Sequence, residues 1–304
     1  MGGRALGRLS TVRYTVPAPL SVGECLAHLL ATASGKTRKQ LLATGRIRVN
    51  GEVVQRADAP LAAGDVVEVA RPTSGASLPR GLALVHEDDD VIVVDKPAGL
   101  LTIATERERE RTAYAYLMAR AHARRPPARI FVVHRLDRGA SGLLVFATSA
   151  EVKRQLQAQF AAHTVERTYL AVVDGRLAAP EGTITDRLVD DAAGRVRATH
   201  RSDRGRTAVT RWRRLRAGTH HTLLEVRLET GRRNQIRVHL AGRGHPVAGD
   251  AVYGSRTDPI GRLALHAHVL GFDHPRTGTR LRFVSPAPGG FAKLSSASRK
   301  RRSV

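Results

Sequence analysis

The sequence predicts an α+β protein, in which a large domain with a mixed, largely antiparallel sheet and flanking helices follows a small α/β domain. The first observation is that short apolar runs recur through residues 82–272, with few helical stretches between them. The second is a segment rich in Pro, Gly and Ser at residues 71–81, which is typical of a linker. The third is the length of 304 residues, which suits one sizeable domain and one small domain.

The N-terminal elements begin after a stretch without periodicity. Residues 1–17 carry basic and small side chains, and we expect a flexible leader there. Apolar residues then recur at helical spacing from Leu20 to Leu30, and a second short helix is expected at residues 39–43. These elements open the small domain.

A hairpin and a strand complete this domain. Asn50-Gly51 is a strong signal for a two-residue hairpin turn, because both residue types tolerate a positive φ. A further strand is predicted at residues 66–69, after Gly64-Asp65. Together these elements predict a compact domain at residues 18–70.

The large domain is predicted at residues 82–285. Runs typical of strands lie at residues 82–85, 91–94, 130–133, 143–147, 168–173, 207–216, 221–229 and 263–272. Helical patterns lie at residues 112–123, 150–161 and 234–241. Residues 286–304 are small, polar and basic, and we expect a disordered basic tail there.

The net charge of +23 indicates a polyanionic partner. The excess of Arg over Lys fits a GC-rich coding sequence, but that bias does not explain the sign of the charge. Nucleic acid is favoured over a membrane face, because no basic amphipathic helix with aromatic anchors is visible. No apolar run is long enough to span a membrane, and the N-terminus lacks a signal-peptide pattern. We therefore expect a cytoplasmic protein.

Motifs for cofactors and metals were sought and set aside. The single cysteine, Cys25, cannot form an internal disulfide, a thiolate zinc cluster or a CxxC pair. His266, His268 and His274 lie close in sequence without an evident acidic ligand, so we expect no metal site. Neither a Walker loop nor a dinucleotide-binding glycine pattern is present, and we expect no nucleotide cofactor. Asp250 is assigned to a structural turn, because its surroundings are rich in Gly and Pro.

The most informative segment is FVVHRLDRGASGLLVFATS, residues 131–149. It places Asp137 on a loop between two predicted strands, where functional side chains are common. Arg135 and Arg138 flank this carboxylate and favour its ionised form. From these residues alone, Asp137 is either a structural ion-pair partner or a reactive carboxylate.

This segment resembles the catalytic motif of the RluA-like RNA pseudouridine synthases, in which HRLD is followed by a Ser-Gly turn and an apolar strand. Four further blocks resemble that family's other motifs in the same order: residues 91–100, 166–175, 229–254 and 263–275. The resemblance covers residues 82–285, and ordered blocks of this kind are far more specific than a lone short motif.

The resemblance implies roles for individual residues. Asp137 would be the essential catalytic carboxylate, Tyr169 would stack on the displaced uracil, and Arg237 would pair with Asp137. Three more residues would contact the substrate nucleotide: Arg135, Leu265 and His266. Without the resemblance, Tyr169 reads equally as a core aromatic and Arg237 as a surface residue of a helix.

Three departures from the family pattern stand out. Gly139-Ala140 replaces the usual Asp-Thr pair, Asn234 replaces a His, and Asp95 replaces an Asn. The first lies beside the Asp137 loop, so we expect it to affect the choice of target more than the reaction.

The N-terminal domain resembles the RNA-binding domain named after ribosomal small-subunit protein four. TRKQLLATGRIRVNGEVV and GDVVEV match its helix, hairpin and closing strand. The resemblance implies that one basic face contacts RNA, as an alternative to a solvated surface, through Lys36, Arg38, Lys39, Arg46 and Arg48.

The sequence as a whole therefore predicts a cofactor-free, monomeric RNA pseudouridine synthase. It would act on structured RNA, with ribosomal RNA favoured over transfer RNA, by flipping a uridine and using Asp137. The alternative is a catalytically silent RNA-binding or ribosome-assembly protein of the same fold. A nucleoside hydrolase would need a second carboxylate or a metal near Asp137.

Overall fold

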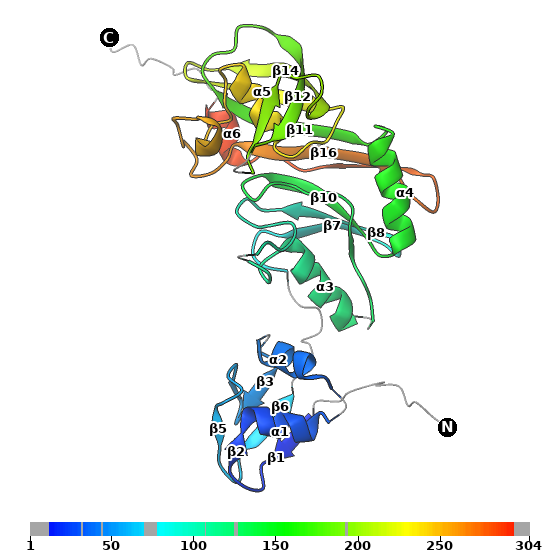
Figure 1. Ribbon diagram of the computed structural model, residues 1–304, viewed down its shortest axis with the longest axis vertical. Helices are drawn as coiled ribbons and strands as arrows, with labels where there is room; N and C mark the ends of the chain where they lie inside the picture. Colours follow the sequence, from blue (N-terminus) through cyan, green and yellow to red (C-terminus); the bar gives the residue numbers. More distant parts are fainter. Residues whose placement is uncertain are drawn as a thin grey trace, which may run out of the picture. The chain divides into compact units, whose positions relative to one another are not determined.

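The computed structural model describes residues 12–31, 33–43, 45–69, 78–106, 108–124, 127–191 and 194–294 (Figure 1). The chain divides into two compact units, of which the first comprises Met1–Ser77 with Ala123–Pro126 and the second Leu78–His122 with Pro127–Val304. Each unit is described by itself. No helix among the described residues is long and apolar enough to cross a membrane.

The first unit packs helices against a small sheet. Its elements are β1 (Val12–Thr15), β2 (Leu20–Ser21), α1 (Val22–Leu29), α2 (Gly35–Ala43), β3 (Ile47–Val49), β4 (Glu52–Val53), β5 (Pro60–Leu61) and β6 (Val66–Val69). The larger sheet has the order β1-β6-β3-β4, and β2 pairs with β5. Ser21 and Glu24 form a capping box at the start of α1, which fixes where this helix begins. Leu26, Ile47 and Val67 are fully buried and belong to its core.

The hairpin prediction is confirmed and the leader prediction is partly wrong. Asn50 and Gly51 have φ values of 51° and 89°, as a two-residue hairpin turn requires. Residues 12–15 were expected to be flexible, but they form β1, which pairs with β6 from Val12↔Val69 to Thr15↔Val66. The closing strand offered an open edge, and β1 covers it. Residues 1–11 lie outside the described part of the chain.

The second unit contains a long mixed sheet. Its first elements are β7 (Ala83–Glu87), β8 (Val91–Lys96), α3 (Ala113–Arg124), β9 (Phe131–Val132), β10 (Ser141–Ala147), α4 (Ala150–Ala161), β11 (Glu166–Asp174), β12 (Glu181–Asp190) and β13 (Val196–Thr199). The remaining ones are β14 (Arg206–Ala217), β15 (His221–Leu228), α5 (Gln235–Gly242), the 3-10 helix η1 (Ala251–Tyr253), β16 (Leu265–Asp273), β17 (Arg280–Val284) and α6 (Gly289–Leu294).

The strand order confirms the predicted fold class. It is β13-β12-β14-β15-β11-β16-β10-β8-β7, with β17 added on β16 and β9 on β10. Within the described residues the pairing is antiparallel throughout, except that β10 runs parallel to β16. That parallel pairing covers only Ser141↔His266 and Gly142↔Ala267. The sheet is therefore mixed and largely antiparallel.

Gly142 makes this parallel contact sterically possible. Its φ is 110°, and a Cβ atom at this position would lie 2.2 Å from the carbonyl oxygen of Ala267. No side chain fits there, so only glycine allows β10 and β16 to pair.

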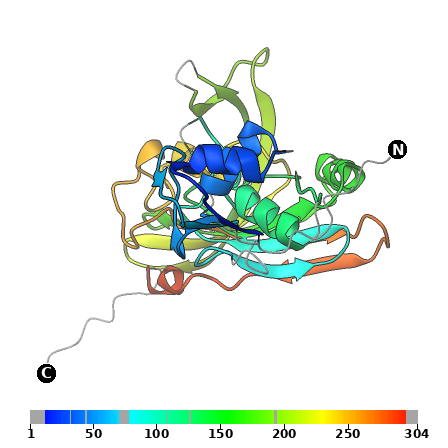
Figure 2. The same ribbon diagram turned by 90° about the horizontal axis from the view of Figure 1, so that it is seen from below.

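The core divides between two clusters on either side of β8 and β10. Leu144 and Phe146 of β10 face the larger cluster, to which α3 contributes Leu117 and α5 contributes Leu240. Leu143 and Val145 face the smaller cluster, together with side chains of α4. Helix α4 packs across β9, β10 and β16 (Figures 1 and 2). Continuous apolar runs in β8 and β10 thus reflect burial on both faces.

The C-terminal prediction is partly wrong. Residues 286–304 were expected to be disordered, but Gly289–Leu294 forms α6, and Phe291 is 0% exposed within the larger cluster. Phe291 is the buried anchor of this short helix, and Leu294 packs against the same cluster. Residues 295–304 lie outside the described part of the chain.

Candidate active site

Asp137 lies on the connection between β9 and β10, and a buried lysine holds this loop. The Nζ atom of Lys96, at the end of β8, donates to the carbonyl oxygens of Leu100 (2.7 Å), Ala140 (2.7 Å) and Pro97 (3.0 Å). Lys96 is 0% exposed, and burial lowers its pKa to about 8, although the negative charge of Asp137 acts in the opposite direction. The ammonium group therefore ties the end of β8 to the loop directly after Asp137.

Two further contacts fix the same loop from the segment after β8. Thr102 Oγ1 donates to the carbonyl oxygen of Leu136 (2.9 Å) and accepts from its amide (3.1 Å). The amide of Gly99 donates to the carbonyl oxygen of Arg138 (2.8 Å). Backbone groups on both sides of Asp137 are thus occupied, which fixes where its carboxylate projects.

Arg237, on α5, brings the second half of the site to Asp137. Its Nη1 atom donates to Asp137 Oδ2 (3.1 Å) and to Asn234 Oδ1 (3.0 Å). Its Nε and Nη2 atoms donate to Asp250 Oδ2 (2.6 Å) and Oδ1 (2.8 Å). Burial alone would lower the pKa of Arg237, but Asp250 and then Asp137 outweigh it and the pKa is raised. The guanidinium is permanently charged and has a carboxylate on each side.

The two carboxylates differ in access. The side chain of Asp250, just before η1, is 1% exposed, whereas that of Asp137 is 23% exposed. Both carboxylate oxygens of Asp250 accept hydrogen bonds from Arg237, whereas only one oxygen of Asp137 does. Asp137 is therefore the carboxylate that a substrate can reach, and Asp250 holds the arginine. The structural turn predicted at Asp250 exists, but its partner, on another element, was missed.

Asn234 and Tyr253 enclose the other side of Arg237. Asn234 has a φ of 53° at the N-terminus of α5, a conformation that asparagine tolerates better than most residues. Its Nδ2 atom donates to the hydroxyl of Tyr253 (3.0 Å). The Cζ atom of Arg237 lies 4.8 Å from the centre of the Tyr253 ring. Asn234 thus links Arg237 to Tyr253 through its side-chain amide.

Tyr169 lies on β11, one strand from β16, and is 9% exposed. Burial raises the pKa of its phenol; Arg167 lowers it, and the charge of Asp137 raises it further. The phenol is therefore protonated at neutral pH, and it lies close enough to Asp137 to sense its charge. The ring belongs to the larger core cluster, as a strand aromatic would, so its accessible edge is small.

The three predicted substrate contacts lie in different surroundings. Arg135 is exposed, two residues before Asp137, and no described residue accepts a hydrogen bond from its side chain. Leu265 is buried at the start of β16. His266 is 2% exposed and shares a hydrogen bond with Ser141 Oγ (2.9 Å). Burial lowers the pKa of His266, so the ring is neutral, and no described contact joins it to Asp137.

The basic residues predicted in the first unit are unequally available. Lys39 and Arg48 are exposed, and Arg48 Nη1 donates to the carbonyl oxygen of Gly51 (2.8 Å). Arg38 and Arg46 are half-buried, and burial lowers the pKa of Arg46. The side chain of Lys36 lies outside the described part of the chain.

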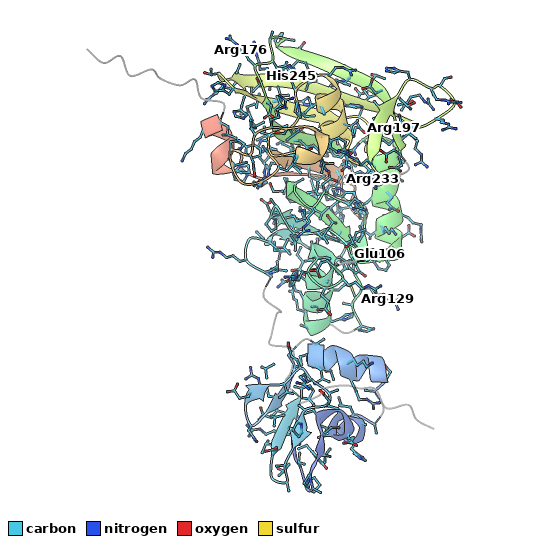
Figure 3. All side chains as sticks on the ribbon, turned by 60° about the vertical axis from the view of Figure 1, so that its left-hand side comes forward. Glu106, Arg129, Arg176, Arg197, Arg233 and His245 are labelled. Carbon is cyan, nitrogen blue, oxygen red and sulfur yellow. The ribbon has the colours of Figure 1, made fainter. Side chains whose placement is uncertain are left out.

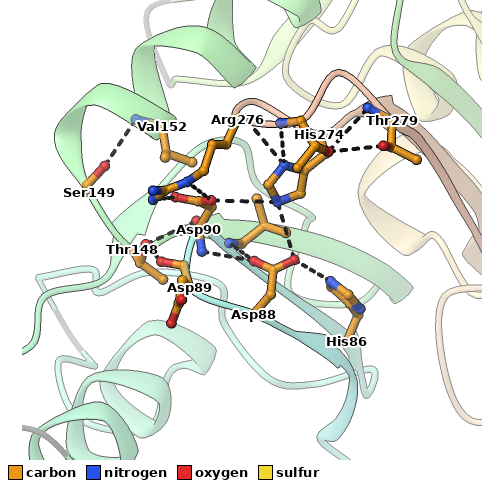
Figure 4. Close-up of polar contacts among 12 residues, drawn as sticks. His86, Asp88, Asp89, Asp90, Thr148, Ser149, Val152, His274, Arg276 and Thr279 are labelled. Carbon is orange, nitrogen blue, oxygen red and sulfur yellow. Dashed lines mark hydrogen bonds and ion pairs between the residues drawn. The ribbon is translucent and has the colours of Figure 1, made fainter.

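A group with metal-ligand chemistry lies elsewhere, where the turn between β7 and β8 meets the turn after β16 (Figure 4). Ligand atoms of Asp88, Asp90 and His274 lie within 4.8 Å of one another. Sequence reasoning noted the histidine but missed the carboxylates, which are far away along the chain. Arg276 binds Asp90 through two hydrogen bonds (2.6 and 2.5 Å), and this contact lowers the pKa of Asp90.

The tautomer of His274 shows that this group is an ion-pair network. Its Nδ1 atom accepts from the amides of Arg276 and Thr277, both at 3.2 Å. The ring hydrogen must then lie on Nε2, which faces Asp88 Oδ2 at 3.3 Å. A metal ion would need Nε2 without its hydrogen, so the arrangement joins two turns instead of holding a cation.

Comparisons with known proteins agree with the motifs at this site. A family model described as RNA pseudouridylate synthase matches residues 90–242, and one described as S4 domain matches residues 23–74. The chain is 38% identical, over 86% of its length and 88% of that protein, to the uncharacterized RNA pseudouridine synthase YlyB of Bacillus subtilis. It is 34% identical, over 95% of its length and 82% of that protein, to the ribosomal large subunit pseudouridine synthase D of Neisseria meningitidis serogroup B.

Solved structures share the fold. Human RNA pseudouridylate synthase domain containing 4 superposes with a TM-score of 0.58 at 23% identity, covering 69% of this chain and 90% of that one. Human RNA pseudouridylate synthase domain containing 1 gives a TM-score of 0.56 at 24% identity, covering 70% and 86%.

Proposed function

This chain belongs to the RNA pseudouridylate synthase family and is an RNA pseudouridine synthase, and we propose that it isomerises uridines of ribosomal RNA with Asp137 as its essential carboxylate. The observation that carries the proposal is the Asp137–Arg237 pair at 3.1 Å, in which the carboxylate keeps one accessible side. A charged, fixed and partly exposed carboxylate suits attack on a substrate or removal of its proton.

The reaction moves the ribose from nitrogen to carbon of the same base. The bond between ribose and the ring nitrogen breaks, the uracil rotates, and the ribose bonds to carbon five, which loses its proton. The ring nitrogen that the ribose leaves takes up a proton, so substrate and product have the same composition and no net redox change or group donor is needed. Asp137 takes part by attacking the sugar or the base, or by removing a proton from the ribose.

The neighbouring residues support these steps in different ways. Arg237 orients Asp137 through a charge-assisted hydrogen bond. The displaced uracil stacks on the ring of Tyr169, whose protonated phenol makes it unsuited to act as the first base. Arg135, exposed beside Asp137, occupies the space that the flipped base leaves in the RNA.

Three observations support ribosomal RNA as the substrate. An S4 domain model matches the N-terminal unit, the net charge is +23, and several relatives are named for the large ribosomal subunit. We further propose that the enzyme acts as a monomer in the cytoplasm; its single cysteine suits a reducing compartment.

The test compares the wild type with Asp137→Asn on a large-subunit ribosomal RNA transcript that carries uridine tritiated at carbon five. The Asn variant keeps the size of the side chain but removes nucleophilicity and basicity, so we expect tritium release to fall below detection. RNA affinity should stay the same or rise, because a negative charge is lost. Asp89→Asn, a change on the exposed turn after β7, is the matched control and should release tritium normally.

Two outcomes would contradict the proposal. Turnover that survives in Asp137→Asn would exclude this carboxylate as the reactive group. A wild type that binds the transcript but releases no tritium would indicate a silent RNA-binding or ribosome-assembly protein, or a different RNA substrate. Chemical mapping of pseudouridine in cells with and without the gene separates these two possibilities.

A further inference from the structure

Arg195, at the start of the second strand of the β12–β13 hairpin, shares an aromatic ring with the active site. Its Cζ atom lies 5.7 Å from the centre of the Tyr253 ring. The same ring lies 4.8 Å from Cζ of Arg237, which holds Asp137. Arg195 is exposed, whereas the side chain of Arg237 is 13% exposed. The Tyr253 ring therefore contacts both the exposed guanidinium of Arg195 and the largely buried guanidinium of Arg237.

The backbone of Arg195 is tied down at both its polar groups. Its amide donates to Asp191 Oδ1 (2.8 Å), and its carbonyl oxygen accepts from the amide of Asp191 (2.8 Å). Arg233, labelled in Figure 3, donates to the carbonyl oxygen of Gly194 (2.6 Å) and to Asp190 on the same hairpin. With its backbone fixed and its side chain on a ring, Arg195 loses little conformational entropy when it binds a ligand.

Within the described part of the chain Arg195 has no counter-ion, whereas some of the arginines around it are paired. Arg233 pairs with Asp190, and Arg201 with Asp203 (3.2 Å). No carboxylate or carbonyl oxygen within the described ranges accepts a hydrogen bond from the Arg195 guanidinium. Its contact with Tyr253 is a cation–π contact, which leaves the N–H groups of the guanidinium edge free to donate.

The charges at Asp137 make such a cation useful. The partly exposed carboxylate of Asp137 repels an approaching phosphodiester, although Arg135 and Arg138 beside it act in the opposite direction. The exposed guanidinium of Arg195, on the Tyr253 ring, adds a further positive charge that attracts the phosphodiester. A guanidinium is well suited to this, because its planar edge binds two phosphate oxygens at once.

We propose that Arg195 binds a phosphodiester of the RNA backbone next to the displaced uridine, using Tyr253 as its support. The inference rests on the proposed function and adds a substrate-binding residue to the same site. It assigns the β12–β13 hairpin a part in holding the RNA strand while the base is out of the stack.

The test uses the full chain and the tritiated large-subunit ribosomal RNA transcript. Affinity is measured over a series of salt concentrations for the wild type, Arg195→Gln, Arg195→Lys and Arg201→Gln. Arg201→Gln removes the same charge from the connection after β13, where Asp203 already neutralises it. We expect Arg195→Gln to weaken binding about tenfold at low salt and to reduce the salt slope by about one phosphate contact. Arg195→Lys should keep the slope, and Arg201→Gln should match the wild type.

Kinetics in the same assay separate this inference from the proposed function. If the wild type releases tritium, Arg195→Gln should raise KM about tenfold and change kcat much less, in line with a lost backbone contact. An unchanged salt slope in Arg195→Gln would overturn the inference. An equal loss of RNA affinity in Arg201→Gln would also overturn it, because it would indicate a general effect of positive charge on RNA binding and not a specific contact of Arg195. A wild type without tritium release would instead contradict the proposed function.

Discussion

Asp250 binds Arg237 through both carboxylate oxygens, with Nε–Oδ2 and Nη2–Oδ1 distances of 2.6 and 2.8 Å. The buried carboxylate thus fixes the guanidinium so that its Nη1 atom donates to Asp137. The orientation of the reactive group consequently depends on a residue that a substrate cannot reach.

We predict that Asp250→Ala destabilises the protein and slows turnover together. Removing one partner of a buried ion pair costs about 3–5 kcal/mol, because the other charge remains buried and unpaired. Asp250→Asn keeps part of the hydrogen bonding and should cost less. Urea unfolding and tritium release measure both effects. If Asp250→Ala were as stable as the wild type, the pair would not hold Arg237 in place.

Tyr169 should tolerate the loss of its hydroxyl better than the loss of its ring. Tyr169→Phe keeps the aromatic face, and we expect RNA affinity close to that of the wild type with reduced turnover. Tyr169→Ala removes a stacking surface worth about 1–3 kcal/mol and should weaken binding as well. Single-turnover kinetics and binding titrations distinguish the two variants. Normal activity in both would exclude Tyr169 from the site.

His134 should make the protein sensitive to acid. Its Nε2 atom accepts from the amide of Val145 (3.2 Å), so the ring must be neutral, and burial lowers its pKa from the ordinary value of 6.5 to about 3. Between these values the unfolded chain binds the proton and the folded one does not, so stability falls as pH drops from 6.5 towards 3. The loss should be about 1.4 kcal/mol per pH unit.

Urea unfolding of the wild type and His134→Gln across this range provides the measurement. Glutamine cannot titrate, so the difference in unfolding free energy between the two proteins should shrink as the pH falls. A difference that stays constant from pH 6.5 to pH 4 would show that His134 is protonated equally in both states.

The C-terminal helix should contribute to stability chiefly through Phe291. Phe291→Ala should cost about 3–5 kcal/mol, as expected for a fully buried phenylalanine. A chain that ends at residue 288 should unfold at a similarly reduced temperature, whereas one that ends at residue 294 should melt like the full chain. Equal melting temperatures for the two truncations would mean that α6 adds nothing to the core.

The N-terminal unit should supply RNA affinity independently of folding in the rest of the chain. A protein of residues 78–304 should keep the melting transition of the larger unit but bind the ribosomal transcript more weakly and with a smaller salt slope. Lys39→Gln with Arg48→Gln, both at exposed positions, should reproduce part of that loss without a deletion. Unchanged affinity in both proteins would contradict an RNA-binding role.

The sequence predicted most strands of the larger sheet, including the arginine-rich β14, and missed three whose apolar alternation is interrupted by charged residues. Strands β8 and β10 are apolar on both faces, so their runs were visible. Strands β12, β13 and β17 carry Arg, Asp or Glu side chains that interrupt the apolar alternation, and they were not predicted. These strands form because neighbouring strands pair with them, although their own composition does not indicate a strand.

The residues of the candidate site could likewise be predicted only in part. Asp137, Tyr169 and Arg237 were identified from motifs, and the structure joins Arg237 to Asp137. Lys96 was missed because its partners are carbonyl oxygens, which leave no mark on the sequence. Asp250 was missed because its role depends on a contact between two separate elements.

The central place of β16 in the sheet has a consequence for biosynthesis. The strand lies between β11 and β10, so it joins the half that carries Asp137 to the half that carries Tyr169 and Arg237. Pairing between residues 141 and 266 cannot form until β16 has left the ribosome. A nascent chain emerges with Asp137 long before the strand that completes its surroundings. The enzyme therefore becomes competent to act on RNA only after β16 has emerged and paired.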